Sequence, residues 1–200
     1  MVPQAPHSWQ RTSLIQHSHC SYCGGAYADD APWPRICPNC TETTWRNPLP
    51  VAVLLLPVRT QDATGLVVVR RDIEPARGQL ALPGGFIETG ETWQEAAVRE
   101  LREEAGLTGD PAEVRLVDVV STFGTINVFG LLPAVDLADL PTSAPTEEAT
   151  EWTVLTRPAP LAFPSHTDLV ASYFASAQQS TMDTWSGKRT GVAPNSSRRA

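Results

Sequence analysis

Five segments of the chain have the length and apolar content of β-strands. Two of them are near-continuous apolar runs on either side of an Asp-Ala-Thr-Gly turn, which is typical of buried strands. A Phe-Gly pair separates two further segments and predicts a hairpin. The predicted strands are residues 51–58, 66–71, 113–122, 125–132 and 151–155.

Two segments have the pattern of helices. Residues 93–105 contain good helix formers and no Pro or Gly, and Gly106 provides a C-terminal stop. Thr92 and Glu95 have the spacing of a capping box at the start of this helix. A second helix is predicted to begin at Ser165 as its cap. Its apolar face would consist of Leu169, Val170, Tyr173, Phe174 and Ala177.

The distribution of these elements predicts an α/β protein of two parts. Residues 48–178 carry all the predicted strands and helices, including a Pro-bearing loop near residue 140, and are long enough for a substantial core. Residues 17–46 form a small cysteine-bearing module, joined to the main domain by the short, stiff Asn-Pro-Leu-Pro link. We expect residues 1–16 to be a flexible tail and residues 179–200 to be disordered.

Three acids crowd one side of the helix predicted at residues 93–105. Glu103 and Glu104 lie three and four residues after Glu100, and like charges at these spacings repel by about 0.3 kcal/mol per pair. A hard divalent cation such as Mg²⁺ would make the same crowding favourable. The alternative is a solvated acidic helix face. The Gly84-Gly85 turn upstream favours the metal site, because its bare backbone lets a carbonyl approach a cation.

The spacing of these residues resembles the Nudix box, G-x5-E-x7-R-E-U-x-E-E-x-G-U with U apolar. The resemblance covers residues 48 to about 178 and implies an α/β/α sandwich with a mixed sheet between helices. It also implies a hydrolase that cleaves the pyrophosphate of a nucleoside diphosphate linked to another group, with Mg²⁺ or Mn²⁺ as the catalytic ion. The matching positions are Gly85, Glu91, Arg99, Glu100, Leu101, Glu103, Glu104, Gly106 and Leu107.

The resemblance implies a role for each matching residue. Glu100, Glu103 and Glu104 would be metal ligands, with the Gly84 carbonyl as a further ligand. Arg99 and Glu91 would orient the loop and the helix.

The general base is less closely defined by the pattern. A box glutamate is one candidate, and an acid of the Thr-Glu-Glu-Ala segment before the last predicted strand is another. Within that segment Glu148 is preferred over Glu147, and a solvated acidic loop is the alternative for both.

The chain's four cysteines form a second constellation, two C-x2-C pairs separated by 13 residues. This spacing is typical of tetrahedral thiolate ligation of Zn²⁺ in a zinc ribbon, and a closed set of four thiolates indicates a structural site. Two disulfides are the alternative, but no basic-then-apolar signal segment supports a secreted protein. The predicted ligands are Cys20, Cys23, Cys37 and Cys40.

The substrate is suggested by a narrower resemblance. A zinc ribbon before a Nudix domain resembles two groups of dinucleotide pyrophosphatases, one acting on NADH and NAD-capped RNA and one on ADP-ribose or FAD. The S-Q-P-W-P-F-P-x-S stretch of the first group is missing, so ADP-ribose or FAD is preferred and NADH or a nucleoside triphosphate is the alternative. Arg70 and Arg71 are candidates for phosphate contacts, with surface solvation as the alternative.

Composition and charge narrow the class of protein. A net charge of −7 argues against nucleic acid as a general partner, and no apolar run is long enough to span a membrane. We expect a cytoplasmic protein whose partner is a small nucleotide, and a homodimer is left open. A Nudix-fold sensor that binds nucleotides without cleaving them, or a ribbon-mediated adaptor, is the alternative of another class.

Overall fold

The structure, a computed structural model, describes residues 17–177. The chain divides into two compact units, Met1–Asn47 and Pro48–Ala200. The tails predicted at residues 1–16 and 179–200 lie outside the described residues. Among the described helices, none is long and apolar enough to cross a membrane.

The N-terminal unit is built around its cysteines. Strand β1 (Arg35–Ile36) pairs antiparallel with β2 (Thr43–Thr44), and the buried cluster consists of Cys20, Cys37 and Tyr27. So small an apolar cluster cannot stabilise a module of this length by itself, and such modules depend on metal ions or disulfides.

The second unit contains two mixed sheets, rather than the one that the sequence predicted. The first has the order β7-β3-β9-β8, in which only the β3–β9 pair is parallel. The second has the order β10-β4-β5-β11, with β6 also paired to β5, and only β10–β4 is parallel. The strands are β3 (Leu49–Leu55), β4 (Pro57–Arg59), β5 (Thr64–Arg71), β6 (Leu80–Ala81), β7 (Gly84–Phe86), β8 (Arg115–Ser121), β9 (Thr125–Leu131), β10 (Val135–Asp136) and β11 (Ala149–Leu155).

The strand predicted at residues 51–58 is interrupted at Leu56, where the chain passes from one sheet to the other. Pro57 has no N–H to continue a ladder, which limits the pairing possible at this position. The Leu56 carbonyl instead accepts a hydrogen bond from the Val67 amide of β5, at 3.0 Å. Strands β3 and β4 therefore follow each other directly in the chain, with β3 in one sheet and β4 in the other.

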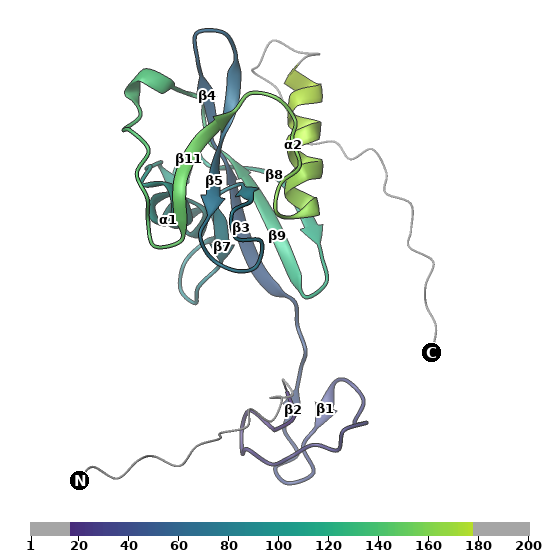
Figure 1. Cartoon of the computed structure of the whole chain (residues 1–200). Coiled ribbons are helices and arrows are strands. Elements are labelled where there is room, and N and C mark those ends of the chain that lie inside the picture. The colour runs from purple at the N-terminus through teal and green to yellow at the C-terminus, as the bar shows by residue number, and fades with distance from the viewer. Residues whose placement is uncertain (1–16, 178–200) are drawn as a thin grey trace, which may run out of the picture. The chain divides into compact units, whose positions relative to one another are not determined.

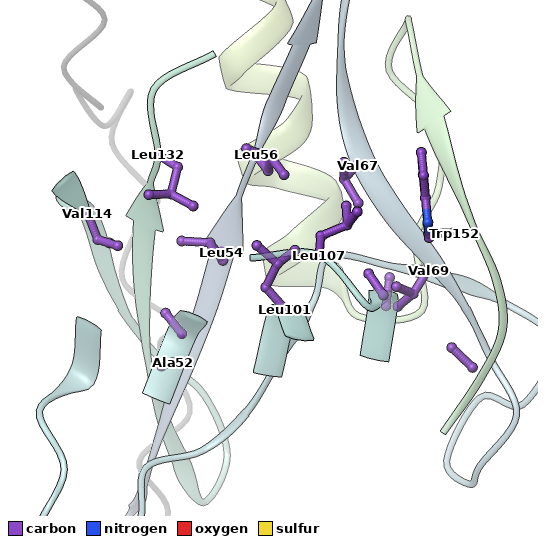
Figure 2. Packing of buried hydrophobic residues seen from close by; sticks show 14 of the residues in the cluster. Ala52, Leu54, Leu56, Val67, Val69, Leu101, Leu107, Val114, Leu132 and Trp152 are labelled. Carbon is purple, nitrogen blue, oxygen red and sulfur yellow. The ribbon is translucent and has the colours of Figure 1, made fainter. Parts of the chain in front are cut away.

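Two helices cover opposite faces of the strand layer, so the predicted α/β/α arrangement is confirmed (Figure 1). Side chains of a strand alternate between faces. Ala52 and Leu54 of β3 pack with Leu101 of helix α1 (Trp93–Ala105), as Figure 2 shows, while Val53 and Leu55 pack on the other face. There they meet helix α2 (Pro164–Ala177) through Leu169, Val170, Tyr173 and Phe174.

The ends of the helices test the predicted caps. Helix α1 has the predicted bounds, its capping box is formed by Thr92 and Glu95, and Gly106 is left-handed with φ 68°. The predicted cap of the second helix is wrong. Helix α2 begins at Pro164, because the fixed φ of proline suits the first helical position. Ser165 lies inside the first turn, where its hydroxyl accepts a hydrogen bond from Asn127 Nδ2 at 3.2 Å.

The remaining short elements are 3₁₀ turns at Pro111–Glu113 and Leu137–Asp139. The second of these lies in the segment predicted as a Pro-bearing loop. The hairpin predicted around Phe123 and Gly124 is confirmed between β8 and β9, with Gly124 at φ 90°.

Candidate active site

Helix α1 presents its three acids at different depths. Glu104 and Glu100 are 3% and 8% exposed, although carboxylates are rarely buried without partners. The Glu103 side chain is 49% exposed. The helix therefore places two carboxylates inside the domain and one at the surface beside them.

Arg99 ties these acids to the preceding loop. Its guanidinium bonds Glu91 through two nitrogens, with Nε–Oε2 at 3.1 Å and Nη2–Oε1 at 2.8 Å. The Nη1 group donates to Glu100 at 2.6 Å and to Glu103 at 3.0 Å, while Nη2 also donates to the Phe86 carbonyl at 2.9 Å. The bonds to Glu91 raise the pKa of Arg99, and Arg99 in turn lowers the pKa of Glu91. This fork fixes the loop, strand β7 and helix α1 to one another.

The Gly-Gly turn lets the backbone lie against the acids. The Gly84 amide donates to Glu104 Oε2 at 3.0 Å. A Cβ on Gly84 would lie 2.5 Å from the Ala52 carbonyl oxygen of the neighbouring strand, and one on Gly85 would overlap the Glu100 carboxylate. Both positions therefore require glycine, because a neighbouring group lies where a Cβ would be. At Gly85 that group is the Glu100 carboxylate.

Burial disfavours the ionised forms of Glu100 and Glu104 when no cation is bound. Desolvation raises the pKa of Glu104 to about 8, against a bond from the Gly84 amide that lowers it. Desolvation also raises the pKa of Glu100, although Arg99 opposes that effect. A divalent cation at this position would favour both ionised forms, so the donor set fits a hard metal ion.

The loop before β11 brings a fourth acid to the cluster. The charge of Glu148 is among the influences that raise the pKa of Glu100 and of Glu104. The Thr146 hydroxyl donates a hydrogen bond to the Glu104 carbonyl oxygen at 3.3 Å and accepts one from the Ala149 amide at 3.1 Å. The Glu148 carbonyl accepts from the Asp72 amide at 2.7 Å, so this loop is anchored on two sides.

Both arginines proposed from the sequence for phosphate contacts have protein partners. Arg70 donates from Nε to Glu151 Oε1 at 2.7 Å, across the β5–β11 pair. Arg71 is 7% exposed, donates to the Pro75 carbonyl at 2.9 Å and lies 5.2 Å from the centroid of the Phe163 ring. The alternation of β5 turns Arg71 inward, where its charge lowers the pKa of Glu104 to a lesser degree than burial raises it. This placement favours a structural role for both.

The four cysteines of the N-terminal unit converge. Their sulfur atoms all lie within 4.8 Å of one another, with Cys20–Cys40 at 3.7 Å and Cys23–Cys37 at 3.5 Å. The backbone amide of Cys23 lowers the pKa of Cys20 to about 6, which favours the thiolate that metals bind. The group can hold a metal ion.

The structure adds residues that no sequence pattern indicated. Thr146 and Asp72 anchor the loop of Glu148, and His166 of α2 bonds the backbone beside the Gly-Gly turn. A short loop threonine and a lone helical histidine have no motif of their own. Only the fold brings them to the site.

Comparisons with known proteins show the family and the fold of the second unit. The model of the NUDIX domain matches residues 48–167, which is more than half of the chain. The crystal structure of a NUDIX hydrolase from Nitrosomonas europaea has a TM-score of 0.66 and 26% sequence identity, covering 85% of this chain and 97% of that one. The NUDIX domain of Shewanella oneidensis NrtR, solved with ADP ribose, has a TM-score of 0.56 at 18% identity, covering 68% of this chain and 91% of that one, and shows the fold alone.

Curated relatives match over shorter segments. An ADP-ribose pyrophosphatase from Methanocaldococcus jannaschii is 52% identical over 42 residues, which is 21% of this chain and 25% of the relative. The NAD-capped RNA hydrolase NudC from Salmonella heidelberg is 28% identical over 92 residues, 46% of this chain and 34% of the relative. The matched segments thus span about a quarter to a third of these relatives' length. The domain match, the fold and the geometry of the box agree that this chain belongs to the Nudix family.

Proposed function

We propose that the protein is a Mg²⁺-dependent pyrophosphatase that hydrolyses a nucleoside diphosphate linked to another group, with ADP-ribose or FAD as its substrate. The observation that carries this proposal is the buried pair Glu100 and Glu104, packed against bare glycine backbone and joined by a surface acid. Such an arrangement costs free energy unless a cation is bound. The short match to an ADP-ribose pyrophosphatase supports the choice of substrate.

The residues that would hold the ion are Glu100, Glu103 and Glu104, with the Gly84 carbonyl as a backbone ligand. These are all oxygen donors, as Mg²⁺ and Mn²⁺ prefer. When bound, the ion would neutralise charge on the phosphate oxygens and lower the pKa of a coordinated water. The protein contributes a preorganised set of donors, since the helix and the turn already hold them in place.

Arg99 and Glu91 would orient this set. The guanidinium stays charged at every relevant pH, and its five bonds to carboxylates and a carbonyl oppose rotation of the acids. Losing Arg99 would therefore release Glu100 and Glu103 together.

Glu148 is the residue that we propose as general base. Its charge raises the pKa of both buried acids, and its loop is bonded to the Glu104 carbonyl through Thr146, which supports a role in taking a proton from a water at this site. Glu147 adjoins it in the same loop and is also exposed. The two neighbours therefore make a matched pair for mutation.

The cysteine site would hold a structural Zn²⁺. Four thiolates complete a tetrahedral shell and leave no position for substrate, so we assign this ion to the stability of the N-terminal unit. It would take no part in hydrolysis.

The test is turnover of the purified protein on ADP-ribose, FAD, NADH, NAD-capped RNA and deoxynucleoside triphosphates with Mg²⁺, with products separated by chromatography. AMP together with ribose phosphate or FMN is expected from the first two. Glu104→Gln should abolish turnover, Glu148→Gln should lower kcat about 100-fold, and Glu147→Gln should leave kcat unchanged. Preferred cleavage of NADH or NAD-capped RNA would transfer the assignment to that group. Nucleotide binding without cleavage would identify a sensor instead.

A further inference from the structure

His166 is a buried titratable residue on the face of the strand layer opposite α1. It lies in α2, is 4% exposed and packs edge-on against the rings of Phe129 and Phe163, with centroids 5.8 and 5.0 Å away. Its Nδ1 accepts a hydrogen bond from the Leu82 amide at 3.3 Å. Leu82 is itself 1% exposed and comes two residues before Gly84, so this bond reaches the backbone of the acid site.

Three successive residues of the turn are held from three elements. Leu82 donates to His166 of α2, the Pro83 carbonyl accepts from the Leu54 amide of β3 at 2.9 Å, and Gly84 donates to Glu104 of α1 at 3.0 Å. A peptide plane bonded on both sides cannot rotate freely. The Pro83-Gly84 plane is bonded through its carbonyl and through its amide, and the Leu82 amide is bonded to α2, so the backbone that leads into Gly84 is held by contacts on both faces of the strand layer.

The chemistry of His166 suits this bond. A ring nitrogen that accepts a hydrogen bond carries no proton, so the neutral ring holds its proton on Nε2. Burial lowers the pKa of His166 to about 4, and the ring therefore stays neutral at physiological pH. Without an acceptor the buried Leu82 amide would be unsatisfied, and the turn would move to find one.

We propose that His166 is a positioning residue, which fixes the Leu82-Pro83-Gly84 backbone from the face opposite α1 and so determines how tightly the acid site binds its divalent ion. This inference rests on the proposed function in one respect, namely that Gly84 and Glu104 help to hold the ion. It assigns to α2 a part in metal binding, although α2 contributes no ligand.

The first test uses Mn²⁺ as the probe, with free ion measured by electron paramagnetic resonance. His166→Phe keeps an aromatic ring and loses the acceptor, while His166→Asn keeps an acceptor near the position of Nδ1. We expect His166→Phe to weaken Mn²⁺ binding about tenfold or more and to lower kcat, with KM for nucleotide changed less at saturating Mn²⁺. His166→Asn should stay within about threefold of the wild type, and Ser172→Ala on the exposed side of α2 should bind Mn²⁺ normally.

Glu104→Gln separates the two proposals. Weakened Mn²⁺ binding in Glu104→Gln with normal binding in a folded His166→Phe would overturn the role of His166 and leave the metal site intact. Normal binding in both variants would overturn the proposed metal site as well. Equal losses in His166→Phe and His166→Asn would also count against the hydrogen bond, because only one of them lacks the acceptor.

A measurement on the wild-type chain covers the case in which a variant does not fold. Nitrogen-15 spectra of the histidine rings distinguish the two neutral tautomers. We expect His166 to carry its proton on Nε2 and the Leu82 amide to exchange slowly with solvent. A proton on Nδ1, or a Leu82 amide that exchanges as fast as an exposed loop, would refute the inference.

Discussion

Replacing Glu104 by Gln should stabilise the metal-free protein at alkaline pH. Burial raises the pKa of this carboxyl from 4.5 to about 8, so between these values the folded chain binds a proton that the unfolded chain has lost. The free energy of unfolding therefore falls as pH rises, by about 1.4 kcal/mol for each pH unit. Over this window the loss is on the order of 3 to 5 kcal/mol, a large part of the stability of a typical domain.

Glutamine removes the charge and keeps an oxygen to accept the Gly84 amide. The variant should match the wild type near pH 5 and exceed it near pH 9, with a smaller remaining slope from Glu100. Urea unfolding followed by tryptophan fluorescence gives the stability of both proteins at each pH. The buffers contain no Mg²⁺, and they contain no chelator because a chelator would remove an ion from the cysteine site. Added Mg²⁺ should stabilise the wild type at pH 9 and have little effect on the variant.

Coincident stability curves for the two proteins would refute this reasoning, because they would show that Glu104 titrates alike in the folded and unfolded chains. A variant that is less stable by the same amount at every pH would show that Glu104 contributes only through its packing. In either case ionisation of Glu104 would not destabilise the folded, metal-free protein.

Four further predictions follow from single contacts. Gly85→Ala should weaken Mn²⁺ binding about tenfold or more in a folded protein, since its Cβ overlaps a buried carboxylate. Thr146→Val removes the hydroxyl that anchors the loop of Glu148, so it should lower kcat about tenfold, whereas Thr146→Ser keeps the hydroxyl and should not. In a protein that already carries Glu148→Gln, Thr146→Val should not lower kcat further. Burial lowers the pKa of His166 from 6.5 to about 4, so the unfolded chain takes up a proton at this residue before the folded chain does. The free energy of unfolding should therefore fall by about 3 kcal/mol as the pH drops from 6.5 to 4, and it should fall less in His166→Asn. Mercurial titration should release one Zn²⁺ per chain, and Cys20→Ser should unfold the N-terminal unit by circular dichroism while activity persists.

Much of the fold followed from local rules. Helix α1 has its predicted bounds because its caps and its helix formers agree, and the acids lie beside its buried stripe as their spacing required. The strand prediction at residues 51–58 was wrong in one respect, since an apolar run does not show where a chain changes sheets. The cap at Ser165 was wrong because Pro164, the residue before it, is already the first residue of the helix.

The site was predictable only where its residues are close in sequence. Periodicity could place Glu100 and Glu104 on one side of a helix, but it could not show that both are buried. Arg71 was a candidate for a phosphate contact, with surface solvation as the alternative, and it lies inside the domain, because which face of a strand points inward depends on the partners of that strand. His166 is 84 residues from the amide that it accepts from, and no local pattern spans such a separation.

The passage of the chain from β3 to β4 at Leu56 has a consequence for the candidate site. The Gly84 turn pairs with β3 in one sheet, whereas Asp72 and Glu148 adjoin β5 and β11 in the other. The chain passes between the two sheets at Leu56 and again between β6 and β7, immediately before the glycine turn. The proposed base and the glycine turn therefore belong to different sheets, so the distance between them depends on residues at these crossings that have no chemical role of their own.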